Sequence, residues 1–81
     1  MDKKIKSIMK QIFNQDINDD FSKNDTDKWD SFAHLDLIVK LEQEFNISFS
    51  PEEIGSIESY NDIKRIIDSK KEYNENLHIA N

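Results

Sequence analysis

Residues 29–45 read WDSFAHLDLIVKLEQEF, and this stretch decides the fold. Its apolar residues recur at helical spacing, and the Asp30-Ser31 pair in front of them offers side-chain oxygens that can cap a helix N-terminus. Asn46 follows, a residue type that tolerates the left-handed backbone found at helix ends. The pattern predicts a helix that begins at Asp30 or Ser31 and runs to about Phe45.

This predicted helix carries two apolar stripes. At about 100° per residue, one face holds the evident core stripe of His34, Leu37, Ile38, Leu41 and Phe45. A second face, roughly 130° around the helix, holds Phe32, Leu35 and Val39, and we call these three residues the outer strip. A chain of 81 residues has little protein with which to cover two faces, so the outer strip is a candidate docking surface. The alternative is that the bundle buries both stripes, with the first loop as the cover.

The N-terminal segment predicts a first amphipathic helix of about three turns. Five apolar residues recur there at the spacing i, i+3, i+4, i+7 and i+8: Ile5, Ile8, Met9, Ile12 and Phe13. Residues 14–28 are mostly polar and predict a long loop that only Ile17 and Phe21 can attach to the core. Long loops inside compact domains are usually functional or loosely ordered.

Two further helix starts follow. Residues 50–53, Ser-Pro-Glu-Glu, form a capping-box pattern with proline at the first helical position, and they open a helix of one or two turns before Gly55. Ser59 and Asp62 open a last helix, which presents a single apolar face made of Tyr60, Ile63, Ile66 and Ile67.

Residues 72–81 show no periodicity, and we predict that they form a frayed C-terminal tail.

The predicted helices together indicate an all-α fold class: a small four-helix bundle of three principal helices plus one short helix, with a long first loop. A single domain would span residues 1–71.

Composition narrows the function. The net charge of −6 would repel a nucleic-acid backbone, and no apolar run is long enough to span a membrane. The N-terminus lacks the apolar centre of a signal peptide, so we expect a soluble, cytoplasmic monomer. Between residues 30 and 68 the chain has nine acidic residues and only three basic ones, Lys40, Lys64 and Arg65. In the rest of the chain the acidic and basic residues are equal in number. This concentration favours a partner with a basic surface.

Residues 29–45 resemble the attachment-site region of acyl carrier proteins. In that family an Asp-Ser pair followed by a large apolar residue begins the second helix, as Asp30-Ser31-Phe32 does here. The family's Leu-Glu-x-Glu-Phe segment corresponds to residues 41–45 at matching spacing. The likeness continues through residues 47–57 into the last helix and covers roughly residues 3–70.

The resemblance implies a cofactor and a set of partners. A holo-acyl-carrier-protein synthase or another phosphopantetheinyl transferase would attach 4′-phosphopantetheine from coenzyme A to Ser31, with magnesium. The thiol of this arm would carry acyl groups as thioesters between acyl-loading and acyl-transferring enzymes with basic docking surfaces. The exposed amides and the dipole of a helix N-terminus suit a phosphodiester. By position, partner binding would fall to Asp30, Phe32, Leu35, Asp36, Val39 and Glu42.

Some residues depart from the family pattern. Ala33 stands where fatty-acid carriers usually have an acid, Lys28-Trp29 replaces small residues, and Phe32 replaces leucine or methionine. Together with His34, these residues look more like a carrier of a specialised pathway than the housekeeping fatty-acid carrier.

Alternatives remain at this point. A peptidyl or aminoacyl carrier of the same fold fits the sequence, and so does an unmodified helical module that docks a basic partner through the outer strip. Ser31 without the family framework would be read as an ordinary helix cap.

Catalytic and metal sites are not favoured. Asp36 points about 160° away from His34 on the helix, so a Ser31-His34-Asp36 triad is excluded. The acids of the first loop lack the glycine and glutamate of an EF-hand, and we predict neither a metal site nor an enzyme activity.

Overall fold

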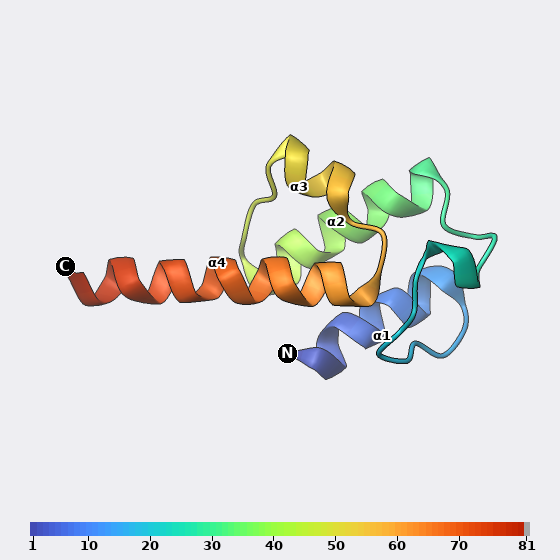
Figure 1. Ribbon diagram of the computed structural model, residues 1–81, viewed down its shortest axis with the longest axis horizontal. Coiled ribbons are helices and arrows are strands. Elements are labelled where there is room, and N and C mark those ends of the chain that lie inside the picture. The colour runs from blue at the N-terminus through green and yellow to red at the C-terminus, as the bar shows by residue number, and fades with distance from the viewer. Residues whose placement is uncertain (81) are drawn as a thin grey trace.

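The computed structural model describes the backbone of residues 1–80 and the side chains of residues 1–71. Four α-helices follow one another: α1 (Asp2–Phe13), α2 (Ser31–Phe45), α3 (Pro51–Ser56) and α4 (Tyr60–Ala80). A short 3-10 helix, η1 (Lys23–Asp25), lies in the loop between α1 and α2. Figure 1 shows α1, α2 and α4 as the principal helices and α3 as a short one. The all-α prediction of three principal helices and one short helix is confirmed.

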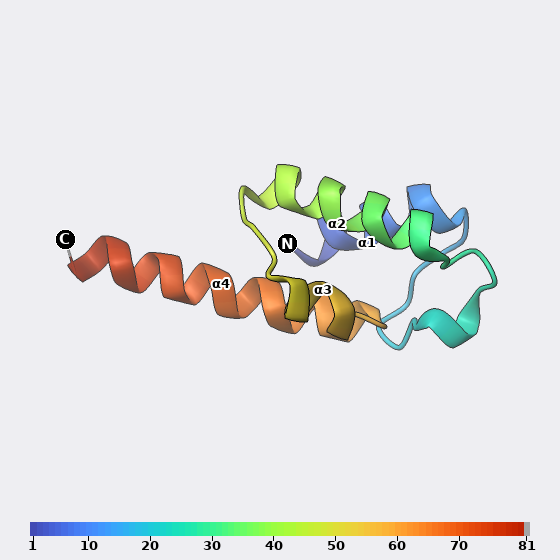
Figure 2. The same cartoon turned by 90° about the horizontal axis from the view of Figure 1, so that it is seen from above.

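The helices pack around one apolar core. α1 contacts both α2 and α4, and in the view from above it lies behind α2 (Figure 2). α1 contributes its predicted stripe to this core, with Ile5, Met9 and Phe13 fully buried. The predicted faces of α2 and α4 meet it through Leu37, Leu41, Ile63 and Ile67, all of them fully buried.

Side-chain caps fix the helix ends where the sequence places them. Asp30 caps α2, since its Oδ1 accepts the Ala33 backbone N–H at 2.9 Å. Ser50 and Glu53 form the predicted capping box of α3. Asn46 ends α2 in the left-handed conformation, with φ of 54°.

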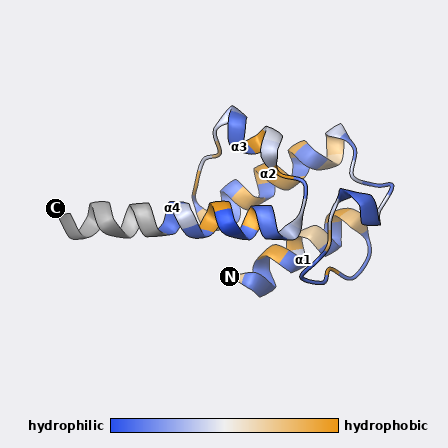
Figure 3. Cartoon of the chain, viewed as in Figure 1, coloured by the Kyte–Doolittle hydropathy of each residue, from blue (hydrophilic) through white to orange (hydrophobic). Residues whose placement is uncertain are grey.

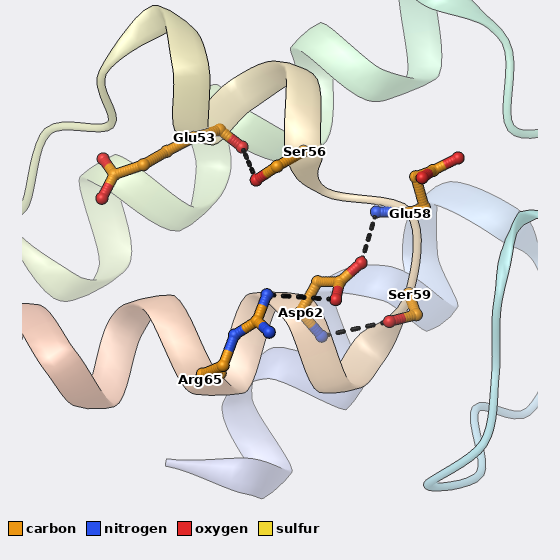
Figure 4. A network of polar contacts seen from close by, with 6 residues as sticks. All are labelled: Glu53, Ser56, Glu58, Ser59, Asp62 and Arg65. Atoms are coloured by element: carbon orange, nitrogen blue, oxygen red, sulfur yellow. Dashed lines mark hydrogen bonds and ion pairs between the residues drawn. The ribbon is translucent and has the colours of Figure 1, made fainter.

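The connection into α4 is held by a small polar network (Figure 4). Ser59 Oγ accepts the Asp62 backbone N–H, and Asp62 Oδ2 accepts the Glu58 backbone N–H at 2.9 Å. Asp62 Oδ1 also pairs with Arg65 at 3.3 Å. These bonds satisfy backbone donors at the start of α4, as the Ser59-x-x-Asp62 pattern predicts.

The first loop makes more contacts with the rest of the fold than its polar composition indicates. Ile17 and Phe21 are buried, as predicted. The loop also pairs with the α3–α4 connection: Lys23 N–H donates to Glu58 O and Tyr60 N–H donates to Phe21 O, both at 2.9 Å. Neither η1 nor this pairing was predicted from the sequence, and the pairing fixes the loop that leads to Ser31.

α4 is helical to Ala80 in the structure. Figure 1 shows its last turns continuing beyond the other helices. The division into a domain of residues 1–71 and a frayed tail of residues 72–81 stays a prediction.

Candidate functional site

Ser31 is the first residue of α2, and its side chain is exposed. The neighbouring Asp30 is the N-cap, so the interpretation of Ser31 as the helix cap is wrong. Among the described residues, no hydrogen bond uses the Ser31 hydroxyl. The backbone N–H groups in the first turn of a helix lack a helical partner. The Asp30 side chain accepts a hydrogen bond from one of them, the Ala33 N–H. An exposed hydroxyl therefore lies at the positive end of a helix dipole.

The outer strip lies on the surface. The exposed fractions are 86% for Phe32, 57% for Leu35 and 48% for Val39. These residues follow Ser31 in α2, whose ribbon carries several apolar bands in Figure 3. The alternative in which the bundle or the first loop covers this strip is wrong. An exposed apolar strip of this kind is unusual on a small monomer and is typical of a docking surface.

The acids beside the strip are already engaged within the chain. Asp36 forms an ion pair with Lys40 one turn along α2. Glu42 is half-buried, and its Oε2 accepts the Phe49 backbone N–H at 2.9 Å. Of the nine acids between residues 30 and 68, four form ion pairs in the described part of the chain: Asp36, Glu44, Glu53 and Asp62. Two of the pairing lysines, Lys4 and Lys70, lie outside residues 30–68 and offset part of the acidic excess of this segment. In the opposite sense, Lys64 of this segment pairs with Asp2 of α1.

His34 is a structural residue. The Trp29 indole N–H donates to His34 Nδ1 at 2.9 Å, and His34 Nε2 lies 2.7 Å from the Ile54 carbonyl oxygen. Because Nδ1 accepts, the ring is neutral and Nε2 carries the proton that it donates to Ile54. Both ring nitrogens are used, and Asp36 pairs with Lys40 instead, so the exclusion of a triad is confirmed.

Trp29 joins the site to the core. Its ring is buried and lies 4.8 Å from the Phe13 ring and 6.2 Å from the Phe21 ring, measured between centroids. Trp29 thus anchors the end of the first loop two residues before Ser31. The burial of Trp29 was not predicted from the sequence, although a tryptophan in a polar loop is typical of a buried anchor.

The remaining shifted pKa values belong to stabilising contacts away from Ser31. The ion pair with Lys70 at 2.7 Å, together with the Ser50 backbone N–H, lowers the pKa of Glu53. Burial raises the pKa of Tyr60, which packs under Lys6. The ion pair with Lys6 lowers the pKa of Asp19. Lys10 pairs with Asp16 at 3.1 Å, so both of these loop acids form ion pairs with lysines of α1.

The described residues contain neither a cluster of metal ligands nor a membrane-spanning helix. In that part of the chain, no three histidine or acidic side chains gather as a metal site. No helix there combines the length and apolar character needed to cross a bilayer.

One known protein resembles this chain in structure. No protein-family model matches the chain, and no curated protein matches its sequence. Among solved structures, a putative acyl carrier protein (Rv0033) from Mycobacterium tuberculosis matches with a TM-score of 0.71 and 26% sequence identity. The match covers 79% of this chain and 89% of that one.

The chain therefore resembles an acyl carrier protein over most of its length. The resemblance recognised in residues 29–45 is thereby confirmed, and the helical order of the structure agrees with it. Two residues that depart from the family pattern, Trp29 and His34, act as one unit, because the Trp29 indole N–H donates a hydrogen bond to the His34 ring. A third, Phe32, is the most exposed large apolar side chain among the described residues.

Proposed function

We propose that this chain carries acyl groups as thioesters on a 4′-phosphopantetheine arm attached to Ser31. The observation that carries the proposal is the Ser31 hydroxyl, exposed at the first position of α2 and unused by the described side chains. A phosphodiester at this place is stabilised by the helix dipole and the neighbouring backbone N–H groups.

The attachment step balances as a phosphoryl-type transfer. Ser31 Oγ forms a bond to the phosphorus that bears the pantetheine group, and the phosphoanhydride bond of coenzyme A breaks. The adenosine bisphosphate half leaves, and the hydroxyl proton passes to a base of the modifying transferase. The chain itself needs no general base, in keeping with a histidine whose two nitrogens are both engaged in packing.

The partners follow from the same surface. We assign to the outer strip, with Asp30, Asp36 and Glu42, the contact with the transferase and with the enzymes that load and unload the arm. The chain would be their substrate rather than an enzyme. Its departures at residues 28, 29, 32, 33 and 34 support a dedicated pathway in place of housekeeping fatty-acid synthesis.

Intact-mass measurement tests the attachment. The purified chain is incubated with coenzyme A, magnesium and a phosphopantetheinyl transferase of broad substrate range. The chain should gain the mass of one arm, whereas Ser31→Ala should gain none. Ser7→Ala, which removes an exposed serine from α1, is the matched control and should be modified like the unaltered chain.

Two other functions give different results. An unmodified interaction module, which the exposed outer strip would also serve, gains no mass with any of several transferases. A peptidyl or aminoacyl carrier gains the arm but is then loaded by an adenylating enzyme with an amino acid.

A further inference from the structure

Ser31 lies on the side of α2 that faces α3. At about 100° per residue, it is roughly 20° from Glu42 and roughly 60° from His34 around the helix. Both of these residues bond to the α3 segment. His34 Nε2 donates to the Ile54 carbonyl oxygen at 2.7 Å, and Glu42 Oε2 accepts the Phe49 backbone N–H at 2.9 Å. We call the contact closed by these two bonds the α2–α3 seam, and it begins one turn from Ser31.

The short helix α3 has few other attachments. None of its six residues is buried, and Ile54 is only partly buried against the core. Glu53 forms an ion pair with Lys70 of α4. One turn beyond the His34–Ile54 bond, Ile38 of α2 and Ile57 at the end of α3 are buried in the core. The seam is therefore closed by polar bonds, with packed apolar side chains one turn further along.

Trp29 holds His34 in its place at the seam. The Trp29 indole N–H donates to His34 Nδ1 at 2.9 Å, and the Trp29 ring itself is buried against Phe13. With one ring nitrogen accepting and the other donating, the imidazole satisfies both partners at once. If the ring turned aside, the indole N–H and the Ile54 carbonyl oxygen would lose their partners, which is unfavourable for groups away from water.

An acyl group carried on Ser31 would meet this closed seam. Apolar carbon chains are driven out of water, so a tethered acyl chain favours any apolar interior that it can enter. The way from Ser31 into the core on this side of α2 passes His34. Entry would require the His34–Ile54 bond to break and the packed side chains of the seam to separate.

We infer that His34 closes the α2–α3 seam to the acyl group, so that the cargo stays outside the bundle. His34 is then a specificity-determining residue, because a long apolar chain would remain in water, whereas a short or polar acyl group needs no apolar interior. The inference rests on the proposed function and names the cargo class that the arm on Ser31 suits: short or polar acyl groups.

Thioester reactivity tests the closed seam. A phosphopantetheinyl transferase of broad substrate range attaches the acylated arm from acetyl- or octanoyl-coenzyme A, with magnesium. Hydroxylamine then attacks the thioester carbonyl carbon, which releases the hydroxamic acid and leaves the free thiol on the arm, and intact mass follows the rate. Each rate is divided by that of the same acyl-coenzyme A. For the unaltered chain the acetyl and octanoyl ratios should agree within about twofold, because neither group is hidden.

Variants of residue 34 assign the closure to the imidazole. His34→Ala removes both bonds, and its octanoyl ratio should fall about threefold to tenfold below its acetyl ratio, as for a group hidden most of the time. His34→Gln retains a donor for the Ile54 carbonyl oxygen and should behave like the unaltered chain. Ile12→Ala is the matched control. It opens space on the other side of α2, next to Ala33, and should leave the two ratios equal.

Two results would overturn the inference: strong protection of the octanoyl thioester on the unaltered chain, or equal ratios in a folded His34→Ala. If far-UV circular dichroism shows His34→Ala unfolded, urea unfolding of the two acyl forms of the unaltered chain decides. Equal midpoints are expected, and a higher midpoint for the octanoyl form would overturn the inference, since a group bound inside stabilises the fold. All these results leave the proposed function standing, because the arm is attached. A chain that gains no arm removes both.

Discussion

α1 and α2 are neighbouring helices that use their apolar residues differently. In α1 every large apolar residue is buried or packed against the core, with Ile5, Met9 and Phe13 fully buried. In α2 the core stripe is equally buried, but Phe32, Leu35 and Val39 remain on the surface. Burial is the main source of stability in a small domain, so α1 is explained by folding alone. The outer strip of α2 adds nothing to the core and requires a function outside it.

The sharpest test of this contrast uses two leucines of the same helix. Leu41 is fully buried and Leu35 is 57% exposed. Leu41→Ala should lower the free energy of unfolding by about 2 to 5 kcal/mol. This is a large share of the roughly 4 to 12 kcal/mol expected for a domain of this size. Leu35→Ala should cost less than about 0.5 kcal/mol.

Urea unfolding followed by far-UV circular dichroism measures both leucine variants. Comparable losses of unfolding free energy in the two variants would mean that the outer strip supports the fold. The contrast between the two apolar faces of α2 would then disappear.

The Trp29–His34 contact should have the next largest effect. Trp29→Phe removes the indole N–H that His34 Nδ1 accepts and leaves a gap beside Phe13, so we expect a loss of about 1 to 3 kcal/mol in unfolding free energy. Far-UV circular dichroism is the readout, because Trp29 is the single tryptophan.

A double-mutant cycle isolates the Trp29–His34 bond. Trp29→Phe and His34→Gln are measured singly and together, and their costs should be less than additive because the residues are bonded. Additive costs would show that the bond contributes nothing beyond packing.

Placing a charge on the outer strip should affect modification rather than folding. Val39→Lys sets an ammonium group at a position that is 48% exposed, so the stability should change by less than about 0.5 kcal/mol. Modification of Ser31 should slow about tenfold, since a buried unpaired charge would oppose the apolar contact.

The matched control for Val39→Lys is Asn61→Lys, at an exposed position of α4, which should be modified at nearly the normal rate. Equal rates for Val39→Lys and the unaltered chain would mean that the strip is idle.

The smallest effect concerns a surface ion pair and its pH dependence. The pKa of Glu53 lies below its ordinary value of 4.5, chiefly through Lys70. The stability that this pair supplies is present above about pH 4.5 and is lost as the pH falls through the lower folded-state pKa. Glu53→Gln should cost about 0.5 kcal/mol at neutral pH, because the amide still caps α3.

The free-energy difference between the unaltered chain and Glu53→Gln should close as the solution is acidified, measured by urea unfolding at several pH values. Glu52→Gln, on an exposed neighbour, should show no such convergence. A difference that widened toward low pH would contradict the assignment of the ion pair.

Local features were predictable from the sequence, and long-range pairing was not. The start of α2, its end at Asn46 and the capping box at Ser50 depend on residues within one turn of each other. The exposure of the outer strip followed from helical periodicity and the small size of the core.

The contacts that the sequence missed join distant segments. Trp29 reaches His34 and Phe13, Lys4 pairs with Glu44, and the first loop pairs with the α3–α4 connection. Counting charges along the chain could not show which acids would find a lysine on another helix. Some of the acids that the charge count assigned to a docking face, such as Glu44 and Glu53, are paired with lysines in the folded chain.

One measurement tests the central claim most directly. After incubation with coenzyme A, magnesium and the transferase, the chain is digested with trypsin and the peptides are weighed. Cleavage after Lys28 and Lys40 releases a peptide of residues 29–40, in which Ser31 bears the one hydroxyl group. The account predicts that the added arm lies on this peptide alone. An arm found on any other peptide, or on none, would contradict it.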